Sequence, residues 1–418
     1  MSYGRLDKLL QERNSWPKWL NYAIDSVADN PTGFLGKVSS LRFRPRGPLP
    51  EVSKSDKNVF TVAIGPVNYS NQGSLWAKSL STFYPDVSTS TFAVEVPGGF
   101  NFPSDVIIPM DFYQRSSRWQ KAQIEALSQF SHVLVEAEEP LVGRLFQRSV
   151  EKESVFLNNR GVSVAYIAHG TDVRIPDKHA KRTKWSPYLD PTIYVNRLNT
   201  IAKKNVDFLN STDNPVFVST PDLLLDLPKA LWCPVVVEIE KWSIFKDTSR
   251  RPGPIRVVHA PSVQTIKGTH LIEPTLSKLH QQGIIEYREL RGIPSRKMPE
   301  AISWADVVLD QFRLGSYGVA AVEAMAAHKV VIGHIIPEVR ELIKGHTGLE
   351  LPIIEATPDN LESVLIKLVA NPLKMDELKS AGGKYVSRLH DGGLSAEILM
   401  NNWIRSAQKE SIVGGNSQ

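Results

Sequence analysis

Short apolar segments alternate with helix-like segments in two successive series along this chain. In the first half, NVFTVAIGP (58–66), SHVLVEAE (131–138) and VSVAYIAHG (162–170) have the length and residue types of buried strands. Segments with helical periodicity separate them, among them SSRWQKAQIEALSQF (116–130), and PLVGRLFQRSV (140–150) also reads as a helix. Because strands that alternate with helices form parallel sheets, the pattern predicts an α/β fold.

The second series follows a break in this rhythm. EKWSIFKDTSRRPGP (240–254) is rich in charge, serine, proline and glycine, which is typical of a linker. Strand-like IRVVHAPS, DVVLDQ and KVVIGHI and helix-like GVAAVEAMAAH come after it. A chain of 418 residues is too long for one core, so we predict two α/β domains that face each other across a cleft. Ligands of such sheets bind beyond the carboxyl ends of the strands, so residues after each apolar run are site candidates.

The first fifty residues have a different character. Apolar residues recur at helical spacing on both sides of Pro17, and the basic, proline-rich segment SLRFRPRGPLP (40–50) follows them. These apolar residues are Leu6, Leu9, Leu10, Trp16, Trp19, Leu20, Ile24 and Val27. The extension either packs on its own domain or forms an element that contacts a membrane surface or a partner, since tryptophan beside lysine and arginine suits an interface.

Charge and cysteine content exclude several classes of protein. The net charge of +5, from 49 basic and 44 acidic residues, fits anionic small molecules or lipids and is too weak to indicate nucleic acid. Cys233 is the single cysteine, so neither an internal disulfide nor a multi-cysteine metal site is possible. The first residues lack the apolar core of a signal peptide, and no apolar run is long enough to span a bilayer. We therefore expect a cytoplasmic protein with possible peripheral membrane contact.

The residues after the strands of the second series suit a nucleoside diphosphate. The dinucleotide-binding, phosphate-loop, zinc-protease and nucleophile-elbow motifs are all absent, as is any Asp-x-Asp pair for a divalent cation. Lys267 follows one strand, and a glycine-bearing turn follows another and enters the helix that carries Glu323. Free amides and the positive end of a helix dipole suit phosphate, and lysine adds a point charge. A carboxylate within the helix can accept hydrogen bonds from both hydroxyls of a ribose.

Order and spacing over roughly 150 residues resemble one known family. The matching segments are HAPS…KGT (259–269), PEAISWADVVLDQ (299–311), GSYGVAAVEAMA (315–326), PEV (337–339), GHTGL (345–349) and VSRLHD…SAEIL (386–399). They are similar to the donor domain of GT-B glycosyltransferases, in particular the large retaining family 4. The N-terminal half resembles the acceptor domain of that family more loosely. The resemblance implies a GT-B fold with two Rossmann-like domains.

Site roles follow from this resemblance, position by position. Lys267 would bind the donor diphosphate together with the amides of Ser316, Tyr317 and Gly318, and Glu323 would bind the ribose. His169, at the end of a strand, would lie beside the transferred sugar. The remaining positions matched to donor binding are Gly73, Ser262, Gly292, Ile293, Pro294 and Gly315, of which residues 292–294 would lie near the base.

The chain departs from the family pattern at two charged positions. Gly315 occupies the place of a first glutamate that normally touches the transferred sugar, and Ser262 occupies the place of an arginine. Side chains that could compensate for the two losses are Asp310, Arg313, Arg291 and Arg296. Simpler roles also stay open: Lys267 could be a solvated surface residue, His169 a histidine satisfied at a strand end, and Gly73 a turn glycine. Asp172 and Arg174 could bind an acceptor or each other.

By this resemblance the domains are an N-terminal extension (1–50), an acceptor-side domain (51–240), a donor-binding domain (241–395) and a C-terminal helix and tail (396–418) that crosses back to the first domain. We expect a hexosyltransferase that moves a sugar from a nucleoside diphosphate sugar to a hydroxyl acceptor, which is a glycan, a lipid-linked or a small molecule. Retention of configuration, no metal and no cofactor are expected, with Lys267, Glu323 and His169 as the catalytic residues. The alternative is a catalytically silent GT-B protein that binds a glycan or a partner.

Overall fold

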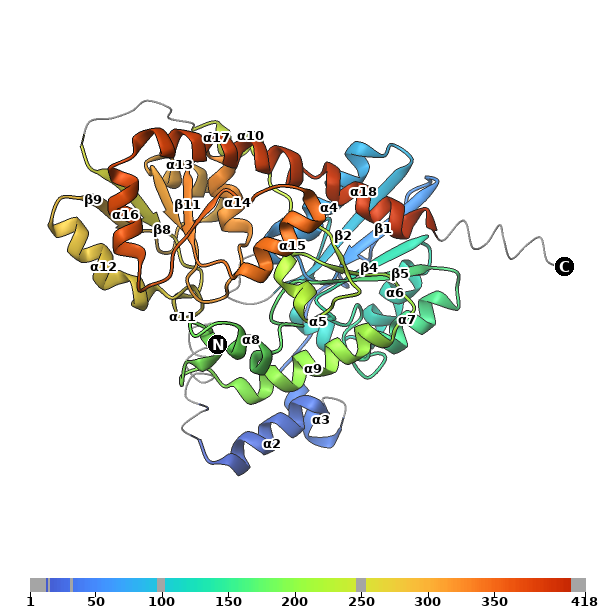
Figure 1. Ribbon diagram of the computed structural model, residues 1–418. Helices are drawn as coiled ribbons and strands as arrows, with labels where there is room; N and C mark the ends of the chain where they lie inside the picture. The colour runs from blue at the N-terminus through green and yellow to red at the C-terminus, as the bar shows by residue number, and fades with distance from the viewer. Residues whose placement is uncertain (1–12, 14–15, 31–32, 96–101, 246–252, 407–418) are drawn as a thin grey trace.

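The apolar runs of the first series form strands that are buried on both faces. The computed structural model describes residues 13, 16–30, 33–95, 102–245 and 253–406. In it every residue of β1 (Phe60–Gly65) and of β4 (His132–Glu136) is buried. Helices cover both faces of the sheet (Figure 1), which explains why these strands lack polar alternation.

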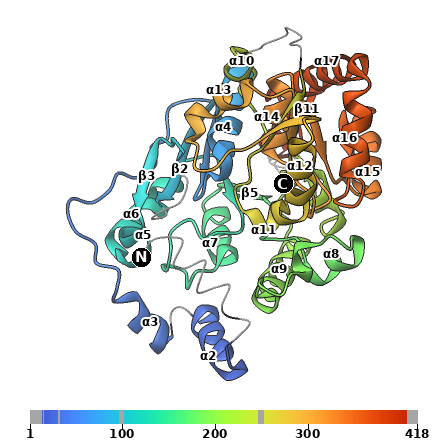
Figure 2. The same ribbon diagram turned by 90° about the vertical axis from the view of Figure 1, so that its left-hand side faces the viewer.

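The first sheet has seven parallel strands in the order β3-β2-β1-β4-β5-β6-β7. Its other strands are β2 (Val87–Glu95), β3 (Val106–Pro109), β5 (Ser163–Ala168), β6 (Val216–Val218) and β7 (Leu231–Trp232). The helices of this half are α4 (Gln72–Phe83), α5 (Met110–Arg115), α6 (Ser117–Leu127), α7 (Val150–Asn158), α8 (Pro176–Arg182), α9 (Val195–Ser211) and α10 (Ile239–Ser243). Helices α2 (Lys18–Asp29) and α3 (Phe34–Ser40) precede them and lie outside the main body in both views (Figures 1 and 2).

The second sheet has five parallel strands in the order β12-β11-β10-β8-β9. They are β8 (Ile255–His259), β9 (Ile285–Glu289), β10 (Val307–Leu309), β11 (Val330–Gly333) and β12 (Ile353–Glu355). The helices are α11 (Gln264–Lys267), α12 (Thr269–Gln281), α13 (Met298–Ser303), α14 (Val319–Ala326), α15 (Pro337–Thr347), α16 (Leu361–Val369) and α17 (Pro372–Leu389). Of the predicted linker (240–254), residues 246–252 lie outside the described residues, and residues 240–243 belong to α10.

The last helix returns to the first sheet. Helix α18 (Gly393–Leu399) continues into a π-helix (Met400–Ile404) whose apolar side chains share a core cluster with β1 and α4. The Trp403 indole N–H donates to Ser163 Oγ at 3.0 Å, which fixes this return to the start of β5. The crossing physically ties the two halves of the chain together (Figure 1).

One predicted helix is absent. Residues 141–148 form successive turns, and the helix begins only at Val150. The Glu153 side chain accepts the amides of Leu141 at 2.6 Å and Val142 at 3.2 Å. Gln147 and Arg148 both have φ +60°, a left-handed backbone that interrupts a right-handed helix. Gly143, at φ +60°, approaches the Tyr113 carbonyl so closely that no side chain would fit there.

A segment of the first half docks on the second half. The ring of His179 in α8 donates to the Leu314 carbonyl at 3.0 Å, and Thr183 bonds the His334 ring at 3.0 Å. Arg313 reaches across to Asp190 with 2.7 Å between nitrogen and oxygen. These polar contacts hold the carboxyl edges of the two sheets toward each other.

Candidate functional site

A cavity of about 930 Å³ lies between the carboxyl edges of the two sheets. The first half contributes residues after β4, β5 and β6, and the second half contributes residues after β8 and β10. Of the predicted site residues, six line this cavity: His169, Ser262, Lys267, Ser316, Tyr317 and Gly318. The fold thus brings the lysine, the glycine-bearing turn and the histidine to one cavity, as parallel sheets place their ligand sites.

Lys267 ends the short helix α11, and its ammonium is already paired. Its Nζ lies 2.6 Å from Oδ1 of Asp310, which directly follows β10. The Asp310 side chain is 2% exposed, and its second oxygen has no hydrogen-bond partner within the described part of the chain. An anion in the cavity would therefore meet a lysine whose charge a buried carboxylate partly neutralises.

The turn between β10 and α14 lines the cavity. Gly318 caps the N-terminus of α14, where the first amides of a helix lack intrahelical partners. The Ser316 carbonyl accepts a hydrogen bond from the Gln311 side chain, which holds the turn in place. The Tyr317 side chain points into the core, where its hydroxyl contacts Tyr385 and His390 at 3.1 and 3.2 Å. Tyr317 can therefore offer the cavity its backbone.

Gly315 does not line the cavity, and its backbone excludes a side chain. Its φ is +66°, and a Cβ at this position would lie 2.6 Å from Ile336 Cγ2. The glutamate that the family resemblance places here would be strained by the left-handed backbone and would collide with Ile336. The conformation and packing of this turn therefore require glycine at the position where the family has glutamate.

Replacing Gly315 by alanine is expected to lower the free energy of unfolding by about 2–4 kcal/mol, because strain and overlap with Ile336 add. Gly348 is the matched control, since its φ is +69° but nothing lies within 4 Å of an added Cβ. Gly348→Ala should lose only about 1–2 kcal/mol. Urea unfolding measures both, and equal losses would contradict the contact with Ile336.

Glu323 lies within α14 and is half-buried, outside the lining of the cavity. Burial raises the pKa of Glu323 to about 8, although the charges of Lys241 and Lys267 oppose the shift. Among the described residues its carboxyl has no hydrogen-bond or ion-pair partner. A carboxyl left without a partner inside an apolar helix is available to a ligand.

The raised pKa of Glu323 predicts a pH-dependent stability. The folded protein holds this proton between about pH 4 and pH 8 while the unfolded chain releases it, so stability falls as pH rises through that range. Relative to Glu323→Gln, the wild type should lose stability from pH 5 to about pH 8. Urea unfolding over this range measures the difference. A constant difference between the two proteins would contradict the burial of this carboxyl.

Residues 292–294 lie elsewhere. Gly292, at φ +63°, and Pro294 are exposed in the loop after β9, and none of the three lines the cavity. Of the charged candidates for compensation, Arg291 pairs with Glu289 at 2.6 Å, and Arg313 bonds the other half of the chain. Neither arginine is among the residues that line the cavity.

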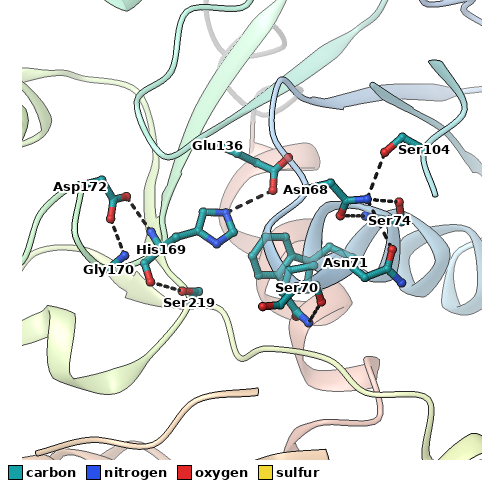
Figure 3. A network of polar contacts seen from close by, with 12 residues as sticks. Asn68, Ser70, Asn71, Ser74, Ser104, Glu136, His169, Gly170, Asp172 and Ser219 are labelled. Carbon is teal, nitrogen blue, oxygen red and sulfur yellow. Dashed lines mark hydrogen bonds and ion pairs between the residues drawn. The ribbon is translucent and has the colours of Figure 1, made fainter. Parts of the chain in front are cut away.

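His169 follows β5 and is paired with a buried carboxylate. Its Nε2 lies 3.2 Å from Oε1 of Glu136, the fully buried last residue of β4 (Figure 3). The rings of Tyr69 and Trp76 each lie 5.5 Å from the imidazole between ring centroids. Burial raises the pKa of Glu136, and the hydrogen bond with His169 opposes this shift.

Gly73 supports this pair rather than the cavity. It lies in the first turn of α4 and does not line the cavity, and a Cβ there would come within 2.8 Å of Glu136 Oε2. The absent side chain leaves room for the carboxylate at the positive end of α4. Glu136 was not among the predicted site residues, because it lies within an apolar run that predicts a strand. An acidic residue at the carboxyl end of a buried strand was the available signal.

Asp172 and Arg174 do not pair with each other. Asp172 accepts the backbone amides of His169, at 2.7 Å, and of Gly170 (Figure 3), whereas Arg174 bonds Asp222 at 2.6 Å. Asp172 also interacts with Glu138, and both residues line the cavity. Burial and then the charge of Asp172 raise the pKa of Glu138 well above its ordinary range. Burial and the neighbouring carboxylate thus both favour the neutral form of the Glu138 carboxyl.

Across the described ranges, no helix combines the length and the apolar character needed to cross a bilayer. In those ranges we also find no group of three or more His, Cys, Asp and Glu side chains arranged to hold a metal ion.

Similar folds occur among solved structures, although no family model and no curated protein matches the sequence. Sucrose-phosphate synthase from Thermosynechococcus elongatus superposes with a TM-score of 0.51 at 13% identity, over 86% of this chain and 100% of that one. A glycosyltransferase from Rickettsia africae gives 0.51 at 11% identity, over 85% and 100%. The catalytic domain of starch synthase IV from Arabidopsis thaliana gives 0.52 at 11% identity, over 84% and 100%.

The chain has the GT-B fold. The predicted fold class is therefore confirmed: two parallel α/β sheets face each other, and the cavity lies between them. At these identities the likeness establishes the GT-B architecture alone. What the cavity binds has to be argued from its own residues.

Proposed function

We propose that this GT-B protein transfers a sugar from a nucleoside diphosphate sugar to a hydroxyl acceptor, with retention and without a metal ion. One observation carries the proposal: Lys267 and the amide-bearing turn before α14 line one cavity with His169 of the opposite half. Positive charge and free amides on one wall suit a diphosphate. A histidine on the facing wall suits the sugar attached to it.

The proposed donor site places positive charge where the leaving diphosphate gains negative charge. Lys267 and the N-terminus of α14 bind the diphosphate, and they stabilise the added negative charge as the bond to the sugar breaks. The ammonium and the helix dipole supply positive charge that a divalent cation provides in other enzymes, which is why we propose metal independence. Glu323 binds the ribose through its unpartnered carboxyl.

In the proposed reaction no protein side chain takes the proton of the acceptor hydroxyl. The acceptor hydroxyl attacks the anomeric carbon on the face from which the diphosphate leaves, and the departing phosphate oxygen takes the hydroxyl proton. His169, oriented by Glu136, contacts the transferred sugar. The cavity walls exclude water, which would otherwise compete with the acceptor.

The acceptor is proposed to enter along α9. Leu198, Ile201 and Phe208 lie on one face of this helix and line the cavity, with successive spacings of three and seven residues. Glu138 and Asp172 line the same side with polar atoms. Lys204 and Asn205 of α9 also line the cavity. A wall that mixes these polar groups and the carboxyl groups with an apolar strip suits a molecule with hydroxyl groups and an apolar portion.

Turnover with UDP-, GDP- and ADP-hexoses tests the proposal. Mass spectrometry is expected to detect hexose transfer or slow donor hydrolysis with at least one donor, at an unchanged rate after EDTA treatment. NMR of the product should show the anomeric configuration of the donor. Inversion would refute the leaving-phosphate route, and loss of activity in EDTA would refute metal independence.

A second candidate function is a catalytically silent GT-B protein that binds a glycan or a partner. The Lys267–Asp310 pair favours it, because a buried carboxylate 2.6 Å from the ammonium disfavours a second anion there. The absence of UDP, GDP and ADP binding in calorimetry supports this reading. Nucleotide binding with turnover of a donor excludes it.

A further inference from the structure

Helices α2 and α3 expose their apolar side chains. On α3, Phe34 is 80% exposed, Leu35 61% and Val38 48%, and Leu41 beyond its end is 53% exposed. At 100° per residue these four side chains form one stripe. On α2, Trp19 is 70% exposed. We call this set, with the neighbouring Tyr22, the apolar surface.

The same helices attach to the main body through polar atoms. Arg144 donates to the Gly36 carbonyl at 3.1 Å, and Gly36 and Ser40 of α3 are buried. On α2, Asp25 accepts from Tyr194 of the main body at 3.0 Å, while the buried Asn21 exchanges hydrogen bonds with Arg13 of the same N-terminal extension. An ordinary surface helix packs its apolar stripe inward. Here the orientation is reversed, so the folded chain leaves the apolar surface without a cover among the described residues.

Positive charge borders the apolar surface. Residues 33–50 contain Lys37, Arg42, Arg44 and Arg46 and no acidic residue. All four side chains are exposed. Aromatic and aliphatic side chains that are flanked by lysine and arginine match the interface of an anionic bilayer, where apolar groups enter the headgroup boundary and cations meet lipid charge.

We propose that the apolar surface of α2 and α3 docks the protein on an anionic lipid bilayer. Its position relative to the cavity is consistent with an acceptor that resides in the membrane. Asp25 of α2 bonds Tyr194, which precedes α9, and α9 lines the cavity with Leu198 and Phe208. Both views place α2 beside α9 at one end of the molecule (Figures 1 and 2).

Vesicle sedimentation of the full chain tests the docking. We expect binding to phosphatidylcholine vesicles that contain phosphatidylglycerol and little binding to phosphatidylcholine alone. Phe34→Ser with Leu35→Ser should weaken binding about tenfold or more. Arg42→Gln, Arg44→Gln and Arg46→Gln together should weaken it about 100-fold, and added salt should mimic this loss.

Ile366→Ser with Leu373→Ser is the matched control, since both side chains are exposed, at 43% and 73%, on other helices. This variant should bind vesicles like the wild type, and circular dichroism should find all variants folded. Failure of the wild type to bind anionic vesicles overturns the proposal. So does a dimer in solution that Phe34→Ser with Leu35→Ser dissociates, because the surface would then be a contact between two copies.

Discussion

Replacing Lys267 by methionine is expected to lower sugar transfer about 10²–10³-fold, because the variant loses the ammonium that we propose stabilises the departing diphosphate. The same change should cost about 3–5 kcal/mol of stability, since the Asp310 carboxylate, 2% exposed, is left unpaired. Transfer rates and urea unfolding measure the two effects separately.

The double variant Lys267→Met/Asp310→Asn separates catalysis from folding. It removes the unpaired charge, so most of the stability should return while transfer stays low. Asp310→Asn alone should strengthen nucleotide binding, because the ammonium no longer has a competing carboxylate. If the double variant transferred sugar at the wild-type rate, Lys267 would have no role in catalysis.

Replacing Arg313 by methionine is expected to cost about 3–5 kcal/mol of stability and to reduce transfer through a loosened cavity. Its guanidinium, 7% exposed, bonds Asp190 of the first half at 2.7 Å and also the carbonyls of Trp185 and Ser186. Burial opposes ionisation of Asp190, but hydrogen bonds from Arg313 and Thr192 lower its pKa to about 2. The depressed value means that ionised Asp190 stabilises the fold.

The lowered pKa of Asp190 also predicts how this stabilisation changes with pH. The stabilisation is fully present above about pH 4, where an unfolded aspartate is ionised, and is lost as pH falls toward 2. The stability difference between wild type and Arg313→Met should therefore shrink with acid. Arg288→Met is the matched control, because the Arg288–Glu286 pair is about half exposed and should lose no more than about 1 kcal/mol. Equal losses in the two variants would contradict the docking role of Arg313.

The alternation of buried strands and helices made the fold predictable from sequence. Strands such as β1 and β4 are buried on both faces, so their apolar runs carry the signal directly. The same pattern gave a wrong prediction for residues 141–148, where Gly143, Gln147 and Arg148 have a left-handed backbone that a helix does not accommodate. Such backbone conformations leave no signal in the apolar pattern.

The position of the candidate site could be predicted from the sequence, but the pairs of side chains within it could not. Lys267, Ser316 and Gly318 follow strands and reach the cavity, since chain order alone places them at the carboxyl edge. The pairing of Lys267 with Asp310 and the contact of His169 with Glu136 join residues from different strands. Their geometry depends on side-chain packing, which periodicity does not encode.

Calorimetric titration with UDP, GDP and ADP tests the central claim most directly. At least one nucleotide should bind the wild type, bind Asp310→Asn more tightly and bind Lys267→Met more weakly, because the ammonium would hold the diphosphate. If none of the three binds the wild type, or if binding is the same in all three proteins, the cavity is not a site for a nucleoside diphosphate sugar.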